Sequence, residues 1–282
     1  MNPEINWNRD WPAPAKLNLF LHVVGRRDDG YHLLQTVFRF IDVADSLCFT
    51  PRSDGEIVMA TPLADVPPAT DLTVRAAQAL RRASGSDHGV NIFLTKRLPM
   101  GGGLGGGSSD AATTLIALNR LWNTGLSSTR LQQIGLTLGA DVPVFIHGRS
   151  TFAEGIGEKF TDVQTEDAWY LVLVPPVAVP TQAIFASALL RRDTPSIVPS
   201  AWYPGFGAND LQPVACKLYP AVAEHLEWLG QHGAARMSGS GACCFVELNS
   251  EAEAKRARAA IPTGMNGFVA RGLAAHPLLD LT

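Results

Sequence analysis

Lys16 and Asp141 are the residues of this sequence whose types best suit the transfer of a phosphoryl group. Such a transfer depends on positioning, on charge neutralisation, and on a group that takes a proton from the nucleophile. A carboxylate can take the proton, and a cation beside it can orient it and stabilise the developing charge. Taken singly, Asp141 is more typical of a helix N-cap, because it lies two residues before Pro143. Lys16, taken singly, is more typical of a solvated residue on a strand. Sequence spacing does not show whether the two meet.

A glycine-rich stretch from Pro99 to Asp110 offers a site for phosphates. Six of the seven residues from 101 to 107 are glycines, so the backbone can adopt positive φ and approach a ligand closely. Apolar residues at helical spacing follow, which predicts a loop that leads into a helix N-terminus, where N–H groups and the helix dipole favour an anion. No Lys-Ser/Thr pair follows the glycines, so this is no Walker A motif, and contiguous glycines do not fit a dinucleotide fingerprint. A flexible glycine hinge is the alternative interpretation.

Two further segments could contribute to the same site. Small residues from Met237 to Ala242 form a second loop, which could share one polyphosphate with the first loop across a cleft. A tight turn before a strand is the alternative. Tyr31 and His32 follow a polar turn over 25–30 and could stack on and hydrogen-bond a planar base. The alternative for this pair is a structural tyrosine and a solvent-exposed histidine.

Alternating strands and helices must position these residues. In the strand over 15–24, aliphatic residues alternate with a second face that begins with Lys16 and Asn18. Strands are also expected over 36–49, 90–94, 169–174, 243–248 and 267–270. Helices are expected over 72–83, after the glycine loop, from 127 or 128, over 181–190, from 209, over 220–230 and over 250–260. The composition shifts near 150–160, where we place a boundary between two domains with α+β or α/β layers.

The composition is that of a globular protein with a sizeable core. Of 282 residues, 46% are hydrophobic and 17% charged, and the net charge of −3 gives no reason to expect a nucleic-acid partner. The four scattered cysteines lack metal-ligand spacing, which favours reduced, buried thiols. No apolar leader or membrane span is seen, so we expect a cytoplasmic protein with no membrane partner. The basic pairs, such as Arg191-Arg192, are expected on solvated helix faces.

Four ordered segments resemble the superfamily of galactokinases, homoserine kinases, mevalonate kinases and phosphomevalonate kinases, the GHMP kinases. They are Pro14–His32, Pro99–Asp110, Leu138–Pro143 and Ser238–Ala242. The segments 14–32 and 138–145 are specific to the branch that phosphorylates the C2 hydroxyl of a methylerythritol linked to cytidine diphosphate, in the non-mevalonate isoprenoid pathway. The resemblance implies an α+β fold with a ribosomal protein S5 domain 2-like ATP-binding domain, a ferredoxin-like C-terminal domain, and the active site between them. We place these domains at 1–155 and 156–282.

The resemblance also implies roles for individual residues. Asp141 would be the general base, with Lys16 hydrogen-bonded to it near the γ-phosphate. Tyr31 and Phe185 would stack on the cytosine, and His32 would hydrogen-bond its edge. The remaining substrate-binding residues would be Asn18, Thr181, Gly239 and Ser240.

The donor would be ATP with Mg²⁺. Lys96 would lie near the adenine end, and the phosphates would be wrapped by the loop residues Pro99, Met100, Gly101, Gly102, Gly103, Leu104, Gly105, Gly106, Gly107, Ser108 and Ser109. Either serine could give a hydroxyl to the metal, but the sequence names no carboxylate ligand. Asp71 stands where the superfamily branch usually has asparagine, and an ionised aspartate only accepts hydrogen bonds, so a side-chain contact with adenine is in doubt there.

Two alternatives stay open: a GHMP kinase acting on another small alcohol, such as homoserine or a mevalonate derivative, and a non-catalytic nucleotide-binding sensor with the same fold. The presence of both Lys16 and Asp141 argues against the sensor, and the Tyr31-His32 pair argues for a substrate with a nucleobase. We expect a monomer or a weak homodimer.

Overall fold

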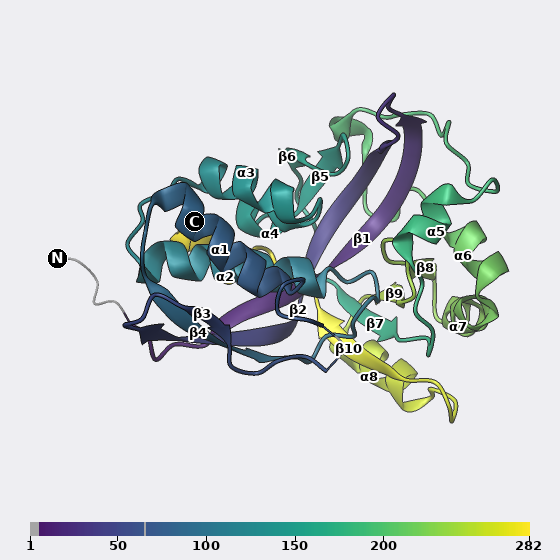
Figure 1. The fold of residues 1–282 in the computed structure, drawn as a ribbon. Helices are drawn as coiled ribbons and strands as arrows, with labels where there is room; N and C mark the ends of the chain where they lie inside the picture. The colour runs from purple at the N-terminus through teal and green to yellow at the C-terminus, as the bar shows by residue number, and fades with distance from the viewer. Residues whose placement is uncertain (1–5, 65) are drawn as a thin grey trace.

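A long antiparallel hairpin runs through the molecule and joins its two halves (Figure 1). It consists of β1 (Trp11–Arg26) and β2 (His32–Arg52), in a computed structural model that describes residues 6–64 and 66–282. The polar turn expected over 25–30 connects the strands, and Gly30 adopts φ +90° there. Residues 13–23 are buried on both faces of β1, whereas alternation alone suggested one apolar and one polar face. The second face is covered because Lys16 and Asn18 bond Gly103 and Thr36, while Phe206 packs on the rings of Phe20 and His22.

The first sheet has six strands and carries four helices. Its order is β3-β4-β2-β5-β6, with β1 paired to β2, and only β3 and β4 run parallel. The apolar faces of the helices pack on one side of this sheet and form a continuous core (Figure 1). The further strands are β3 (Ile57–Met59), β4 (Gly89–Thr95), β5 (Thr151–Glu154) and β6 (Lys159–Asp162). The helices are α1 (Leu72–Ser84), α2 (Gly106–Leu121), α3 (Ser128–Leu138) and α4 (Val142–His147).

Local capping explains where α1 begins and ends. The Asp71 carboxylate accepts hydrogen bonds from the N–H groups of Thr73, at 2.7 Å, and Val74, at 3.3 Å, which satisfies two donors of the first turn. Gly85 ends the helix in the left-handed conformation, with φ +70°. The departure at position 71 therefore has a structural role, because the side chain is buried and engaged as an N-cap.

The second half contains an antiparallel sheet in the order β10-β7-β9-β8. Its β-α-β-β-α-β succession and this strand order are those of a ferredoxin-like sandwich, as expected. The strands are β7 (Trp169–Leu173), β8 (Arg236–Met237), β9 (Cys244–Leu248) and β10 (Gly267–Arg271). The helices are α5 (Thr181–Ala186), α6 (Gln212–Leu218), α7 (Pro220–Gly230) and α8 (Glu251–Ala259), with short 3-10 turns η1 (Pro199–Ala201) and η2 (Leu279–Leu281).

Three local expectations in this half were wrong. Helix α5 ends at Ala186 rather than 190, so Arg192 lies on an irregular segment and not on a solvated helix face. Helix α6 begins at Gln212 rather than 209, because the Asn209 amide is held by the carbonyl oxygens of Met237, at 2.7 Å, and Gly239, at 2.8 Å. A long-range contact thus fixes Asn209 ahead of the helix, while its Oδ1 accepts from the N–H of Leu211 at 2.9 Å.

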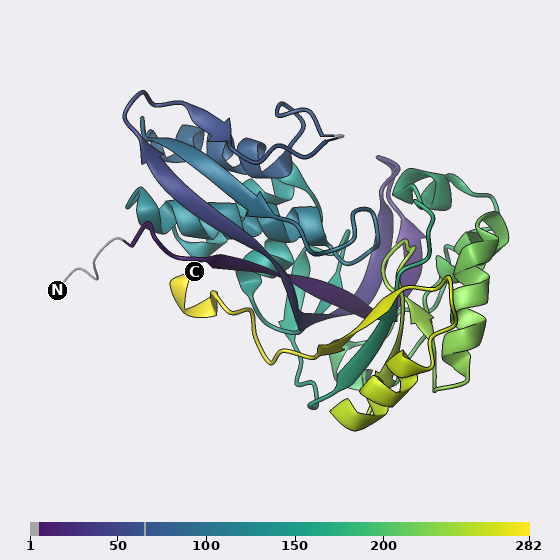
Figure 2. The same ribbon diagram turned by 90° about the horizontal axis from the view of Figure 1, so that it is seen from below.

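The two halves share segments of the chain. Leu21 and Val23, at the far end of the hairpin, pack into the core of the second half. The last segment returns to the first half, where Leu278 is buried in its core (Figure 2). The first sheet extends to Asp162, past the proposed division at 155/156, which stays a prediction. Within the described residues, no helix combines the length and the apolar character needed to cross a membrane.

Candidate active site

A cavity of about 1080 Å³ lies where the two halves meet. Its walls come from β1, the glycine loop, the start of α4, helix α5 and the 239–241 loop. It is lined by all but one of the residues that the sequence analysis assigned to catalysis, ATP or substrate. The exception is Ser109, whose hydroxyl is buried on the inner side of α2. Contact of the Ser109 hydroxyl with phosphate or metal stays a prediction, and the cavity lining does not support it.

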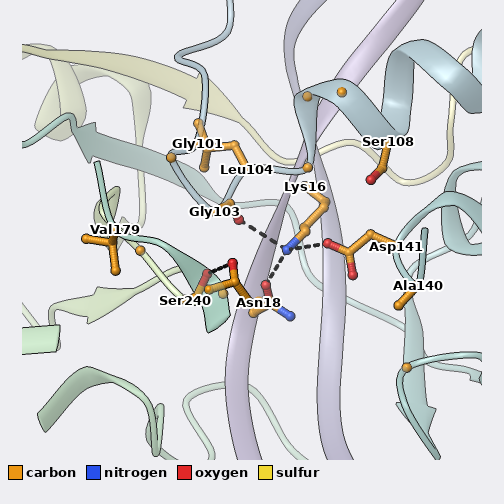
Figure 3. Close-up of a pocket in the computed structure, with 18 of the residues that line it drawn as sticks. Lys16, Asn18, Gly101, Gly103, Leu104, Ser108, Ala140, Asp141, Val179 and Ser240 are labelled. Atoms are coloured by element: carbon orange, nitrogen blue, oxygen red, sulfur yellow. Dashed lines mark hydrogen bonds and ion pairs between the residues drawn. The ribbon is translucent and has the colours of Figure 1, made fainter. Parts of the chain in front are cut away.

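The Lys16 ammonium is the centre of the site (Figure 3). Its side chain is 3% exposed, and Nζ donates to Asn18 Oδ1 at 2.5 Å and to the carbonyl of Gly103 at 3.1 Å. The same Nζ lies 3.3 Å from Oδ2 of Asp141. Its backbone N–H donates to the carbonyl of Leu104 at 2.9 Å. Lys16 thus joins the substrate strand, the glycine loop and the carboxylate, although sequence spacing could not show that these meet.

Asp141 occupies the N-cap position of α4, but its side chain makes no capping hydrogen bond. Pro143 in the first turn lacks an N–H group, which removes one donor that a cap would otherwise satisfy. The Asp141 side chain is 36% exposed and lines the cavity. Its carboxylate is therefore directed by Lys16 and available to a ligand, which favours the base interpretation over the capping one.

The glycine loop packs against the second small-residue loop, so some of its glycines are needed for this packing and not only to leave space for a ligand. A Cβ on Gly103 would lie 2.1 Å from the carbonyl oxygen of Ser238, and one on Gly102 would lie 2.6 Å from Sγ of Cys243. The hydroxyl of Ser238 donates to the carbonyl of Gly103 at 2.9 Å, and the N–H of Cys243 donates to the carbonyl of Gly102 at 3.0 Å. These two glycines hold the loops together, whereas Gly101, with φ +67°, has open space around its Cα.

The glycine loop ends at the N-terminus of α2, a helix of 16 residues. Gly105 takes the N-cap position with φ +74° and has no side chain that could satisfy the N–H groups of the first turn. Those groups and the positive end of the helix dipole face the cavity beside Ser108. The junction has the properties of an anion site suited to phosphate.

A buried charge cluster supports this helix start from behind. The Lys96 ammonium pairs with Asp45 and, at 2.8 Å, with Asp110 in the second turn of α2. Asp45 also accepts from the N–H groups of Arg97 and Leu98, at 2.6 and 2.9 Å. Burial raises the pKa of Asp110 to about 7, against the opposing effect of Lys96. Lys96 lines the cavity, but its charge is engaged by these carboxylates, and its place near adenine stays a prediction.

The opposite end of the cavity carries aromatic side chains. His32 stacks on Phe185, with ring centroids 4.8 Å apart and an angle of 29° between the planes. Tyr31 is 60% exposed beside them. The hydroxyls of Thr181 and Ser240 lie 2.7 Å apart, which links α5 to the second loop. Flat surfaces with polar groups nearby suit a planar base, although the sandwich of Tyr31 and Phe185 around it stays a prediction.

Sequence reasoning missed two residues that organise the site. Asp45 interrupts an apolar strand, which is a signal that a buried carboxylate needs a partner. Arg192 was assigned to a solvated face, yet its guanidinium hydrogen-bonds His32. No local pattern could have identified Arg192, because its partner is 160 residues away.

The cavity fits a metal ion carried by a nucleotide rather than one held by a protein cage. Within residues 6–64 and 66–282, no three His, Cys, Asp or Glu side chains gather into a metal site. Mg²⁺ bound to nucleotide phosphates keeps several waters and takes one or two protein oxygens. The Ser108 hydroxyl at the start of α2 is an oxygen of this kind.

Comparisons with known proteins point to one family. Residues 71–149 match the family profile described as GHMP kinases N terminal domain, and residues 201–267 match GHMP kinases C terminal. A protein of Dechloromonas aromatica (strain RCB) named 4-diphosphocytidyl-2-C-methyl-D-erythritol kinase is 62% identical over 96% of this chain and 100% of its own length. A protein of the same name from Thiobacillus denitrificans is 58% identical over 96% of this chain and 97% of its own.

Solved structures have the same fold. The crystal structure of a 4-(cytidine 5'-diphospho)-2C-methyl-D-erythritol kinase superposes with a TM-score of 0.80 at 33% identity, over 94% of this chain and 99% of that one. A homoserine kinase from Cytophaga hutchinsonii superposes with a TM-score of 0.72 over 95% of this chain and 94% of its own. At 14% identity, the second similarity concerns the fold alone. The expected two-part α+β architecture is confirmed.

Proposed function

We propose that this chain, which belongs to the GHMP kinase family, transfers the γ-phosphoryl group of ATP to the C2 hydroxyl of 4-diphosphocytidyl-2-C-methyl-D-erythritol. The products are the 2-phosphate and ADP, as in the non-mevalonate route to isoprenoid precursors. The observation that carries the proposal is the Lys16 ammonium, which contacts both the Asp141 carboxylate and the carbonyl of Gly103 in the glycine loop. A base and a phosphate-binding loop are thereby held around one cation.

Asp141 is the general base of the proposed reaction. Its carboxylate takes the proton of the C2 hydroxyl while the hydroxyl oxygen forms a bond to the γ-phosphorus and the bond to the β,γ-bridging oxygen breaks. The Lys16 ammonium, 3.3 Å from Asp141, keeps the carboxylate directed at the acceptor and offsets the charge on the transferred group. Asn18, which receives a hydrogen bond from Lys16, contributes to the acceptor side from the same strand.

The donor lies along the glycine loop in this proposal. Residues 101–108 wrap the phosphates of ATP, and the N-terminus of α2 neutralises part of their charge. Mg²⁺ held by the phosphates, with the Ser108 hydroxyl as its protein oxygen, supplies further charge neutralisation when bound. The Lys96–Asp45–Asp110 cluster maintains the position of α2 relative to the loop.

The acceptor is recognised through its base. Tyr31 and Phe185 provide stacking surfaces and His32 a hydrogen bond to the cytosine, while Thr181, Gly239 and Ser240 lie along the rest of the substrate. A kinase for homoserine or mevalonate would have no use for three aromatic rings at this end of the cavity. These rings support the cytidine-containing acceptor over another small alcohol.

The proposal is tested by incubating the protein with γ-labelled ATP, Mg²⁺ and one alcohol at a time. The panel contains 4-diphosphocytidyl-2-C-methylerythritol, methylerythritol 4-phosphate, homoserine and mevalonate. We expect label only on the first, and protection of the protein by CDP. Transfer to homoserine or mevalonate would assign another GHMP kinase activity, and nucleotide binding with no transfer would assign a sensor.

A further inference from the structure

Arg192 is held in one orientation beside the aromatic end of the cavity. Its Nη2 donates to the carbonyls of Phe185, at 2.9 Å, and Ser187, at 2.8 Å, and its Nη1 donates to that of Leu190 at 3.0 Å. Its Nε donates to Nε2 of His32 at 3.0 Å. Arg192 itself does not line the cavity, so its contacts bear on a ligand only through His32 and the 185–190 segment.

The contact with Arg192 decides which nitrogen of His32 carries the proton. A guanidinium only donates hydrogen bonds, so Nε2 must present its lone pair, and the proton of the neutral ring must then be on Nδ1. No hydrogen bond engages Nδ1 in the part of the chain that the structure describes, and the ring lines the cavity. Burial lowers the pKa of His32, and the cations Arg192 and Arg26 lower it further, which favours the neutral ring. His32 therefore offers a donor, and not an acceptor, to a ligand.

We propose that Arg192 is a positioning residue that fixes His32 as an Nδ1–H donor and so selects cytosine over uracil. This proposal rests on the proposed function, which places a pyrimidine nucleotide here. Cytosine carries an acceptor at N3, next to the acceptor O2, whereas uracil carries an N–H donor at N3. A fixed Nδ1–H donor of His32 can hydrogen-bond N3 of cytosine. In uracil it would face the N3–H donor, which leaves both polar groups unpaired. The stacking of His32 on Phe185 limits rotation of the ring away from this role.

The state of His32 can be measured without any substrate. The chain has seven histidines, and long-range ¹H–¹⁵N correlation on histidine-labelled protein separates protonated from bare ring nitrogens. The His32→Gln protein assigns the signal by its absence. We expect a neutral ring with a protonated Nδ1 and a bare Nε2 at pH 7.5. A ring protonated on Nε2, or on both nitrogens, would overturn the proposal, whether or not any variant of Arg192 folds.

Substitutions at Arg192 test the link to the base. In Arg192→Met we expect the KM for the cytidine substrate to rise about tenfold, with kcat within about threefold and the KM for ATP unchanged. The ratio of UDP to CDP inhibition constants should fall about tenfold, and the His32 proton should redistribute to Nε2. Arg192→Lys keeps one donor for Nε2 and should restore part of the ratio. Arg191→Met is the matched control, because Arg191 is exposed and pairs with Asp193 instead.

The two proposals fail in different ways. If the wild-type protein does not phosphorylate the cytidine substrate or bind CDP, the proposed function is wrong, and so is the cytosine selection. If it does, but a folded Arg192→Met protein keeps the wild-type ratio of UDP to CDP inhibition, only the role of Arg192 is refuted. Retained near-ultraviolet circular dichroism shows that the variant is folded.

Discussion

Replacing Asp141 with asparagine tests whether its carboxylate acts as a base or only supports the structure. Asparagine has the same shape and keeps an oxygen that can accept from the Lys16 ammonium, 3.3 Å away, but it cannot take a proton. The carboxylate makes no capping hydrogen bond, so the start of α4 does not depend on its charge. We therefore expect the change to affect catalysis far more than stability.

The magnitudes follow from the exposure and the contacts of Asp141. Its side chain is 36% exposed and forms one ion pair, and the buried Lys16 ammonium keeps Asn18 Oδ1 and the Gly103 carbonyl as acceptors, with the new amide oxygen as a third. The loss should be within about 1 kcal/mol, which corresponds to a shift in Tm of about 4 °C or less. Loss of a general base lowers kcat by about 10²- to 10⁴-fold, or about 3–5 kcal/mol of transition-state stabilisation. The KM for ATP should stay within about threefold, because the proposed function places the phosphates on the glycine loop and not on Asp141.

The assay is single-turnover transfer of labelled phosphate, which measures chemistry free of product release. Asp162→Asn is the matched control, since Asp162 is also exposed and paired with a cation, Arg149 at 3.7 Å, but does not line the cavity. That variant should react at the wild-type rate. A single-turnover rate of Asp141→Asn within about threefold of wild type would remove Asp141 from the base role. Loss of more than about 10 °C in Tm would show that its charge is structural.

Two other positions give predictions with opposite character. Gly103→Ala places a Cβ 2.1 Å from the carbonyl oxygen of Ser238, so it should lower the free energy of unfolding by more than about 2 kcal/mol and weaken ATP binding. Gly101→Ala, whose Cβ meets no neighbour, should lower the free energy of unfolding by only about 1 kcal/mol. Urea unfolding and ATP titration measure both variants, and equal losses would refute the loop-packing role of Gly103. The folded-state pKa of Asp110, about 7, lies above its unfolded value, so its contribution to stability is complete below pH 4 and is lost as the pH rises to about 7. In urea unfolding, Asp110→Asn should remove the decline in stability between pH 4 and 8, and loss of the pair with Lys96 should lower the stability by a constant amount. A variant with the same pH profile as the wild type would contradict the raised pKa.

Much of the local structure could be predicted from the sequence, because short-range physics determines it. Helix α1 begins and ends where Asp71 and Gly85 can cap it, and the glycine loop leads directly into α2. The expected strand over 90–94 is present as β4, one residue longer at each end. Errors occurred where a distant partner acted on a local segment, as at Asn209, which bonds Met237 and Gly239 and lies before α6 instead of beginning it.

The candidate site was predictable as a set of residues but not as an arrangement. Resemblance to the GHMP kinases named the cavity-lining residues, yet it placed Ser109 with them, and the inner face of α2 buries that hydroxyl. It also placed Lys96 near the adenine, which stays a prediction, but it did not indicate the two buried carboxylates that engage the ammonium. Residue type identifies a possible ligand, but burial and partners determine whether its polar atoms are free.

The sequence by itself determined which chemistry this protein carries: a glycine loop before a helix, a lysine on a strand and an aspartate before a proline. Only the tertiary structure brought Lys16 against Asp141 and Gly103, and Arg192 against His32. These contacts join residues 87 to 160 positions apart, where no periodicity or capping rule operates. They form because two separately patterned halves pack on one hairpin, and that packing decides which charges meet in the cavity.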